Sequence, residues 1–269
     1  MTKLTVQISV TRGKYLETVL SSIRNASIDD VEIIVVNSGD PEEVSKLCRT
    51  YACMEIRKKC SLLMSRFLGA TNATGDYTMI LDETRAPSEG LIKSVLHSPH
   101  QMIAFPEVQI GGGFINWLDG IDKQLTFEME KSWAYTNLII PRFYSTELLN
   151  KVFSEIKLNI SPEKFSRIVA KDDRIIYHEA QRISGNEVFL SNFKLLHYND
   201  TNILNEFKKY ARYGSTSRVL RGTKYEFMNS TFDKFRKLRS FRDLPVLMLY
   251  GIRGLSYEAG YYFFKNNER

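Results

Sequence analysis

The sequence predicts an α/β protein with a mostly parallel central sheet flanked by helices and followed by a helical C-terminal appendage. Three observations support this prediction. Short apolar runs alternate with stretches of helical spacing through the first hundred residues, a pattern typical of βαβ units. Turn-forming residues separate the runs, and none approaches the roughly 18 apolar residues of a membrane-spanning helix. Beyond about residue 205, bases and aromatic residues become interleaved.

The spacing of apolar residues predicts the strands and helices of the first hundred residues. Residues 4–10 alternate as a strand does, and residues 15–23 repeat their apolar side chains with helical spacing. By the same reasoning we expect strands at residues 31–36, 54–57 and 77–81, and helices at residues 41–51, 60–73 and 87–96.

The pattern becomes less regular after Pro99. Three consecutive glycines at 111–113 indicate a flexible loop or a close approach of the backbone to a ligand. Between Pro99 and the tail we expect strands at 102–109 and 137–142, helices at 146–156 and 172–184, and extended segments at 187–190 and 193–196.

Two pairs of adjacent acids lie where a ligand site is expected. Asp82 and Glu83 directly follow the apolar run 77–81, and in open α/β sheets ligands bind beyond the carboxyl ends of the strands. Asp172 and Asp173 stand where a helix begins. Each pair also has a simpler interpretation, because the first can open a solvated turn and the second can cap a helix.

Net charge and cysteine content indicate which partners and which cellular compartment to expect. The formal net charge of +6 favours anionic partners such as phosphates, acidic lipid head groups or nucleic acid. Cys48, Cys53 and Cys60 match no usual zinc spacing and no disulfide framework, so we expect free thiols in a reducing cytosol. The N-terminal ten residues alternate like a strand and lack the features of a signal peptide.

The tail mixes bases with aromatic residues and includes a basic cluster at 234–242. Such a composition beside short apolar helical segments suits an interfacial helix at an anionic membrane surface. A helical hairpin that packs on the domain with its bases in water explains the same pattern, and the two interpretations are compatible. The sequence has no visible aromatic stacking motif for RNA, so nucleic acid is not an expected partner.

The order of these pieces resembles the family 2 glycosyltransferases, inverting enzymes with the GT-A fold, from about Thr5 to Gly214. The resemblance rests on five stretches: residues 9–12 with Tyr15 and Leu16; residues 33–40; Arg66, Gly69, Ala73 and 75–77 leading into Leu81 and Asp82; Asp172 and Asp173 with Arg182 and Gly185; and His197. It implies a GT-A domain over 1–205, with a nucleotide-binding half at 1–100 and an acceptor half at 101–205. We expect residues 206–269 to form a helical extension.

The resemblance implies a UDP- or GDP-linked sugar as donor. It places the following residues around the nucleotide: Thr11, Arg12, Asn37, Ser38, Arg66 and Asp82. The leaving diphosphate is usually neutralised by Mg²⁺ or Mn²⁺ on oxygen ligands, and Asp82 matches the first Asp of the family's Asp-X-Asp motif. Thr84 replaces the second Asp, so Thr84, Glu83 and His197 complete the expected metal set.

Inverting transfer needs a general base for the acceptor hydroxyl. Asp173 matches the family's catalytic Asp, and Asp172 is the second candidate. The implied activity is hexosyl transfer to a hydroxyl or to a lipid-linked phosphate or glycan. A polyprenyl-phosphate acceptor is expected to meet four bases of the tail, namely Lys208, Lys209, Arg212 and Arg218. We therefore expect a cytoplasmic protein suited to a peripheral position on the inner face of the membrane.

Two other classes compete with this interpretation. A sugar-phosphate nucleotidyltransferase expects a glycine-rich basic loop after the first strand, and residues 11–14 are a poor version of it. A catalytically silent binding module is favoured by two departures from the family pattern, Thr84 at the metal motif and Asn37 where an Asp commonly accepts the base N–H.

Overall fold

The computed structural model describes residues 2–26, 28, 30–39, 41–132, 139–185, 188–229 and 244–264. A seven-stranded sheet runs through the molecule in the order β3-β2-β1-β4-β8-β6-β9, and a three-stranded sheet has the order β5-β10-β7. The strands of the large sheet are β1 (Leu4–Val10), β2 (Val31–Asn37), β3 (Met54–Arg57), β4 (Tyr77–Asp82), β6 (Met102–Ala104), β8 (Phe143–Ser145) and β9 (Phe189–Leu190). The strands of the small sheet are β5 (Arg85–Pro87), β7 (Glu107–Ile110) and β10 (Leu195–Tyr198).

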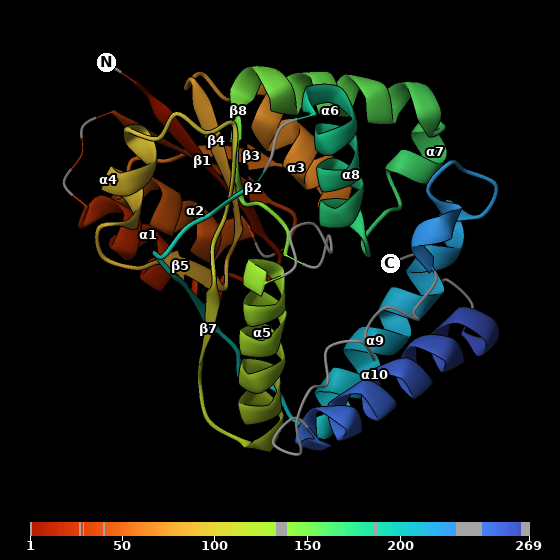
Figure 1. Cartoon of the computed structure of the whole chain (residues 1–269). Coiled ribbons are helices and arrows are strands. Elements are labelled where there is room, and N and C mark those ends of the chain that lie inside the picture. Colours follow the sequence, from red (N-terminus) through yellow and green to blue (C-terminus); the bar gives the residue numbers. More distant parts are fainter. Residues whose placement is uncertain are drawn as a thin grey trace.

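Helices connect and cover these strands (Figure 1). They are α1 (Leu16–Arg24), α2 (Pro41–Thr50), α3 (Leu62–Thr71), α4 (Leu91–Leu96), α5 (Phe114–Ser132), α6 (Thr146–Asn159), α7 (Pro162–Phe165), α8 (Asp172–Ser184), α9 (Ile203–Ser217) and α10 (Leu244–Phe263), with short 3-10 turns η1 (Arg218–Leu220) and η2 (Glu226–Asn229). The expected α/β class with a mostly parallel sheet and a helical C-terminal part is confirmed.

The strands β1, β2, β3 and β4 are mutually parallel, whereas β8 runs antiparallel to both of its neighbours. The register aligns Ser9 of β1 with Asp82 of β4 and Val10 with Asn37 of β2. The chain therefore leaves three adjacent strands at the same edge of the sheet, which brings the loops after them together.

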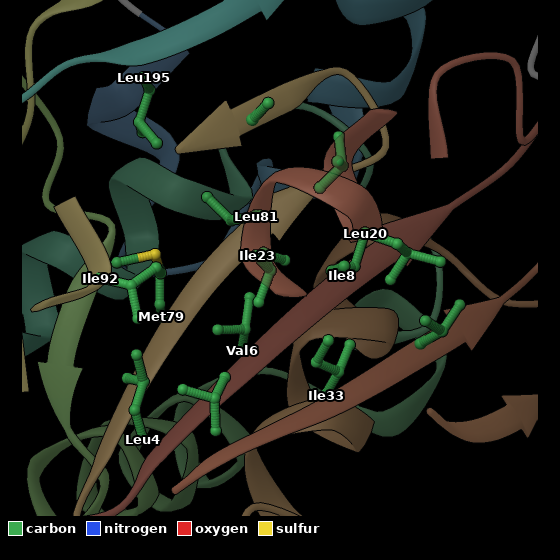
Figure 2. Close-up of a cluster of buried hydrophobic side chains, with 14 of the residues drawn as sticks. Leu4, Val6, Ile8, Leu20, Ile23, Ile33, Met79, Leu81, Ile92 and Leu195 are labelled. Atoms are coloured by element: carbon green, nitrogen blue, oxygen red, sulfur yellow. The ribbon is translucent and has the colours of Figure 1, made fainter. Parts of the chain in front are cut away.

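Two apolar clusters lie on opposite sides of the large sheet, because successive side chains of a strand point to opposite faces. Met79 and Leu81 of β4 pack with α1, α2 and α4, and Figure 2 shows the side chains of this cluster. Ile80, between them, packs with α3, α6 and α8. Each fully buried side chain of this size contributes about 1.5–3 kcal/mol, so the two faces fix the register of the strands.

The helices α9 and α10 run side by side at a distance from the large sheet (Figure 1). Their close approach requires glycine: a Cβ on Gly214 would lie 1.9 Å from the carbonyl oxygen of Tyr257, and a Cβ on Gly260 would lie 1.8 Å from that of Ala211. Helix α10 also packs on α5, where Leu118 of α5 and Leu249 of α10 are fully buried. None of the helices in the described ranges has the length and apolarity needed to cross a bilayer.

Several element predictions were wrong in detail. The helix expected at 87–96 begins only at Leu91, and strand β5 at residues 85–87 was not predicted. The strand expected at 102–109 is broken into β6 and β7 on either side of Pro106, which lacks the N–H that a continuous ladder needs. Helix α5, directly after the three glycines, was not predicted. A strand was expected at 137–142, but residues 139–142 are not in a strand. Residues 137 and 138 lie outside the described residues, as does the basic cluster at 234–242. The three cysteines are free, as expected.

Candidate active site

The loops after β1 and β2 meet at the carboxyl edge of the sheet, where the sequence placed the nucleotide. Thr11 and Arg12 are exposed directly after β1. Ser38 donates both its backbone N–H and its hydroxyl to the carbonyl of Val10, at 2.9 and 2.8 Å. Asn37 donates to Glu55 at 3.0 Å and accepts from the N–H of Gly39 at 3.2 Å. These contacts fix the two loops against each other.

Glu83 binds the backbone of the loop after β1. Its carboxylate accepts from the N–H groups of Thr11 at 3.2 Å, Arg12 at 3.0 Å and Gly13 at 2.5 Å. The turn requires a glycine at position 13, where φ is +78°. Glu83 therefore joins the loop after β4 to the loop after β1.

Asp82 turns the other way, as expected for the neighbour of Glu83 at the end of a strand. One of its oxygens accepts from the backbone N–H of Thr84 at 3.1 Å and from the Thr84 hydroxyl at 2.6 Å. The other forms an ion pair with the guanidinium of Arg85. Burial alone would raise the pKa of the Asp82 carboxyl, but Arg85 and the nearby bases outweigh burial and hold this pKa well below its usual range.

Arg85 belongs to a network of charges around Glu107. The Glu107 carboxylate lies 2.6 Å from Nε of Arg85, 2.9 Å from Nζ of Lys123 and 3.8 Å from Nη2 of Arg142. Burial alone would raise the pKa of Glu107, but the three cations lower it. Glu107 is thus shared among three bases, and each base has a second acidic partner: Asp82 for Arg85, Asp119 for Lys123 and Asp173 for Arg142.

His197 lies on β10, directly opposite Arg85 in the antiparallel register. Its Nδ1 contacts Nζ of Lys123 and lies 3.7 Å from Glu107. Burial, with Arg85 and Lys123 adding to its effect, lowers the pKa of His197 to about 3. The imidazole is therefore neutral at physiological pH.

Asp172 and Asp173 begin helix α8, and they have different surroundings. Nε of Arg66 lies 2.7 Å from Oδ2 of Asp172, and both side chains are almost fully buried; the geometry is that of an ion pair and not of a linear hydrogen bond. Asp173 is more exposed, at 24%, and lies 3.3 Å from Nη2 of Arg142. Both acids thus have a guanidinium as partner.

The pKa values of the two acids are shifted in opposite directions. Burial raises the pKa of Asp172, with the charge of Asp173 adding to the rise and Arg66 opposing it. Burial would likewise raise the pKa of Asp173, but Arg142 and Arg66 outweigh burial and lower it. Asp173 is therefore the carboxylate that stays ionised and accessible.

A cavity of about 450 Å³ joins these groups. Its charged lining comprises six cationic and three anionic side chains: Arg66, Arg85, Arg142, Lys171, Arg174 and Arg253, with Asp82, Asp172 and Asp173. Four tyrosines from α9 and α10 line it as well: Tyr210, Tyr213, Tyr250 and Tyr257. Another hollow of about 490 Å³, along α6, lies away from the strand ends and has no comparable cluster among its described lining residues.

Lys171 precedes the two acids and has an unusual backbone conformation for a residue with a side chain. Its φ is +67°, in the left-handed region that side chains disfavour. Its ammonium lies 5.4 Å from the centre of the Tyr257 ring, and burial lowers its pKa to about 8. Strained residues of this kind cluster at functional sites, in agreement with the position of Lys171 at the wall of the cavity.

The expected metal ligands do not form a metal site in this arrangement. Both oxygens of Asp82 contact Thr84 or Arg85, Glu83 binds backbone N–H groups on the other side, and His197 contacts Lys123. Within the described ranges, no three His, Cys, Asp or Glu side chains gather as metal ligands. The residues present therefore do not fit the Mg²⁺ or Mn²⁺ that the resemblance implies.

Arg253 connects the appendage to the site. Its guanidinium lies 2.6 Å from Asp119 of α5, 3.2 Å from Asp122 of α5 and 2.6 Å from Glu206 of α9. The same α10 residue lines the cavity beside Tyr250. The tyrosines of α10 are therefore positioned by a buried ion-pair network.

This network predicts acid sensitivity. Burial alone would raise the pKa of Asp119, but Arg253 and Lys123 hold it at about 2, below the ordinary 3.8. Since the folded-state pKa is depressed, the stabilisation is complete above pH 4 and is lost as the pH falls toward 2; it amounts to about 2 kcal/mol. Urea denaturation at pH 7 and pH 3 should show a smaller pH-dependent loss in Asp119→Asn than in the wild type. An equal loss in both proteins would contradict this assignment.

A comparison with known proteins finds a family match in the part of the chain that forms the strand ends of the site. Residues 8–98 match the family model described as Glycosyl transferase family 2. This segment resembles family 2 glycosyltransferases. It covers about a third of the chain and runs from the last residues of β1 through β4, including both acids of the β4 tip. The resemblance found in the sequence is therefore confirmed, and no curated protein matches the chain.

Solved structures extend the likeness in fold. TarS from S. aureus (residues 1–349) has 10% identity and a TM-score of 0.53, over 97% of this chain and 81% of that one. A mannosyltransferase from Pyrobaculum calidifontis, in complex with GDP-Man and Mn²⁺, has 14% identity and a TM-score of 0.56, over 97% and 72%. Glucosyl-3-phosphoglycerate synthase from Mycobacterium tuberculosis, with Mn²⁺ and UDP, has 14% identity and a TM-score of 0.52, over 81% and 79%. The fold is of the GT-A type.

The structure thus brings four of the expected site residues together in one cavity and places further charged and aromatic side chains beside them. Arg66, Asp82, Asp172 and Asp173 line one cavity, whereas Thr11, Arg12, Asn37 and Ser38 surround the adjoining strand ends. Sequence reasoning missed Arg85, Arg142, Lys171 and the four tyrosines. A signal existed for the tyrosines, because Tyr210 and Tyr213, like Tyr250 and Tyr257, recur at helical spacing.

Proposed function

We propose that the chain is an inverting glycosyltransferase that moves a sugar from a UDP- or GDP-linked donor to an acceptor hydroxyl or lipid-linked acceptor. The observation that carries the proposal is the cavity, which has an ionised, accessible carboxylate at Asp173 beside a cluster of buried arginines. It lies at the strand ends of a segment that resembles family 2 glycosyltransferases. Three solved neighbours of the same fold, described above, include complexes with GDP-Man or with UDP.

In this mechanism the acceptor oxygen attacks the anomeric carbon as the bond from that carbon to the diphosphate oxygen breaks. Asp173 accepts the proton of the acceptor hydroxyl, and the diphosphate leaves with the bonding electrons. The arginines that face the cavity, Arg66, Arg85 and Arg142, stabilise the negative charge that develops on the leaving group. Asp172, held by Arg66, positions the start of α8 and thereby its neighbour.

The nucleoside part of the donor is proposed to lie at the loops after β1 and β2. Arg12 and Thr11 are exposed there, and Glu83 holds their backbone in place. The amide of Asn37 already bonds to Glu55 and to Gly39, so the neighbouring loop is rigid where the base is expected.

The acceptor is proposed to enter along α9 and α10. Four tyrosines there line the same cavity as the acids, and flat aromatic rings offer apolar faces with a polar edge. The bases expected to meet a lipid-linked phosphate have different surroundings: Lys208 and Arg212 are exposed, Lys209 lies 3.9 Å from Glu206, and Arg218 donates to the carbonyl of Phe264. Of these bases, Lys208 and Arg212 are proposed as phosphate contacts. A cytoplasmic, peripheral membrane position belongs to the same proposal.

A donor panel tests the proposed function. The full chain is incubated with UDP- and GDP-linked hexoses, with and without Mn²⁺, and release of the nucleoside diphosphate is measured together with sugar transfer to polyprenyl phosphate and to soluble glycans. Release of UDP or GDP that requires Asp173 supports the proposal. Binding without turnover, unaffected by Asp173→Asn, would indicate a silent binding module, and formation of a nucleoside triphosphate would indicate a nucleotidyltransferase.

A further inference from the structure

The carboxylate expected to hold a metal ion is already paired with a cation from its own loop. Asp82 accepts two hydrogen bonds from Thr84 on one oxygen and contacts Arg85 with the other. The neighbouring acid, Glu83, points to the opposite side and is bound to three backbone N–H groups. A divalent ion at Asp82 would have to displace the guanidinium of Arg85 and share the site with its positive charge.

Arg85 is held firmly in this position. Its Nε and Nη2 donate to the two oxygens of Glu107, at 2.6 and 3.3 Å, and its Nη1 donates to Asp82. These bonds occupy three of the five N–H groups of a guanidinium. The side chain is 15% exposed and lines the cavity. Arg85 is therefore a fixed cation at the cavity wall with N–H groups left to bind a ligand.

The surrounding charges favour an anion at this wall. Arg142 is 8% exposed on its side chain, and burial, together with the nearby charges of Arg85 and Arg66, lowers its pKa. The charges of Arg85 and Arg66 repel that of Arg142, and the carboxylates of Asp173 and Glu107 oppose this effect. An anion with several oxygens relieves this repulsion and matches the planar donor geometry of arginine.

We propose that Arg85, together with Arg142, binds the donor's diphosphate directly and takes the place of the divalent cation, so that nucleoside diphosphate binding is independent of metal. This inference rests on the proposed function, since it concerns the same donor. Its physical basis is that a fixed guanidinium supplies charge to the leaving group without the reorganisation that a mobile ion requires.

Binding measurements on the full chain test the inference. Isothermal titration calorimetry with UDP and with GDP is performed in EDTA and again in Mn²⁺. We expect at least one of them to bind with dissociation constants that agree within about threefold in the two conditions. Arg85→Gln should weaken this binding by about tenfold or more, as expected for loss of charge-assisted hydrogen bonds. Arg49→Gln, on the exposed face of α2, is the matched control and should leave the dissociation constant unchanged.

A second variant keeps the test decisive if Arg85→Gln fails to fold. Asp82→Asn preserves the shape of the side chain and removes the anion that competes with the diphosphate for Arg85. Metal-free binding should become severalfold tighter in this variant, whereas a metal site built on Asp82 predicts weaker binding. Circular dichroism verifies the fold of each variant.

The negative outcomes are distinguishable. Binding that requires Mn²⁺ and is lost in Asp82→Asn would overturn the inference and leave the proposed function standing. Metal-free binding that is unaffected by Arg85→Gln would overturn it in the same way. If neither UDP nor GDP binds under any condition, the inference and the proposed function both fail.

Discussion

Replacement of Asp173 by asparagine is expected to reduce kcat for sugar transfer by about 10²–10⁴-fold, the usual contribution of a general base. Asparagine keeps the size of the side chain and can still accept from the N–H of Arg174, which bonds to the carboxylate at 2.9 Å. It cannot accept a proton from the acceptor. Binding of the nucleoside diphosphate, measured by calorimetry, should therefore change far less than kcat.

Asp200→Asn is a matched control for this substitution. Asp200 is an exposed carboxylate that bonds to Lys14 and lies outside the described lining of the cavity, so its replacement should leave kcat within about twofold, in line with the small effects of exposed charges. If Asp173→Asn retains full activity while Asp172→Asn abolishes it, the base is Asp172 and the assignment of roles is wrong.

Replacement of Arg253 by methionine should lower the free energy of unfolding by about 3–5 kcal/mol, because it leaves buried acids without their counter-charge. Glu206 is fully buried, and Asp119 is 6% exposed; both lie 2.6 Å from the guanidinium. Methionine fills much of the same volume, so the loss reports charge and not a void. Urea denaturation measures the effect.

Arg182→Met gives the comparison for the same change on the surface. Arg182 also has two acidic partners, Glu179 and Glu155, but its side chain is 49% exposed. Water screens the exposed guanidinium, and the buried Glu179 keeps Lys224 as a partner at 2.9 Å, so the expected loss is much smaller than that for Arg253. Equal losses for the two arginines would mean that the network around Arg253 does not hold α10 in place.

The sequence predicted the parts of the fold in which local pattern and tertiary environment agree. The four parallel strands were found because their apolar runs are short and bounded by turns, and α8 was found because Asp172 and Gly185 mark its ends. Helix α5 was missed because its start follows three glycines, which indicate a loop. Strand β5 was missed because its pairing with β10 joins residues that are far apart in the sequence, and local spacing holds no information on such contacts.

The site was predictable to a similar degree and for similar reasons. Asp82 was identified because it follows a strand end, and Asp173 because it stands at a helix start and matches the family's catalytic Asp. Treating Glu83 as a partner of Asp82 ignored the alternation of side chains along an extended chain, which sends the two acids to opposite sides. The role of Arg85 depends on Glu107 and on the register of β5 with β10, and neither follows from its place in the sequence.

The bond between Glu83 and three successive amides has a kinetic consequence. A loop that is already closed before the donor arrives pays no ordering entropy when the nucleoside binds. Donor association should then be a single fast step limited by encounter, because no slow loop rearrangement has to precede it. Donor residence time would accordingly depend on the contacts that the ligand itself makes, so selectivity between nucleotides is expected to reside in the dissociation rate.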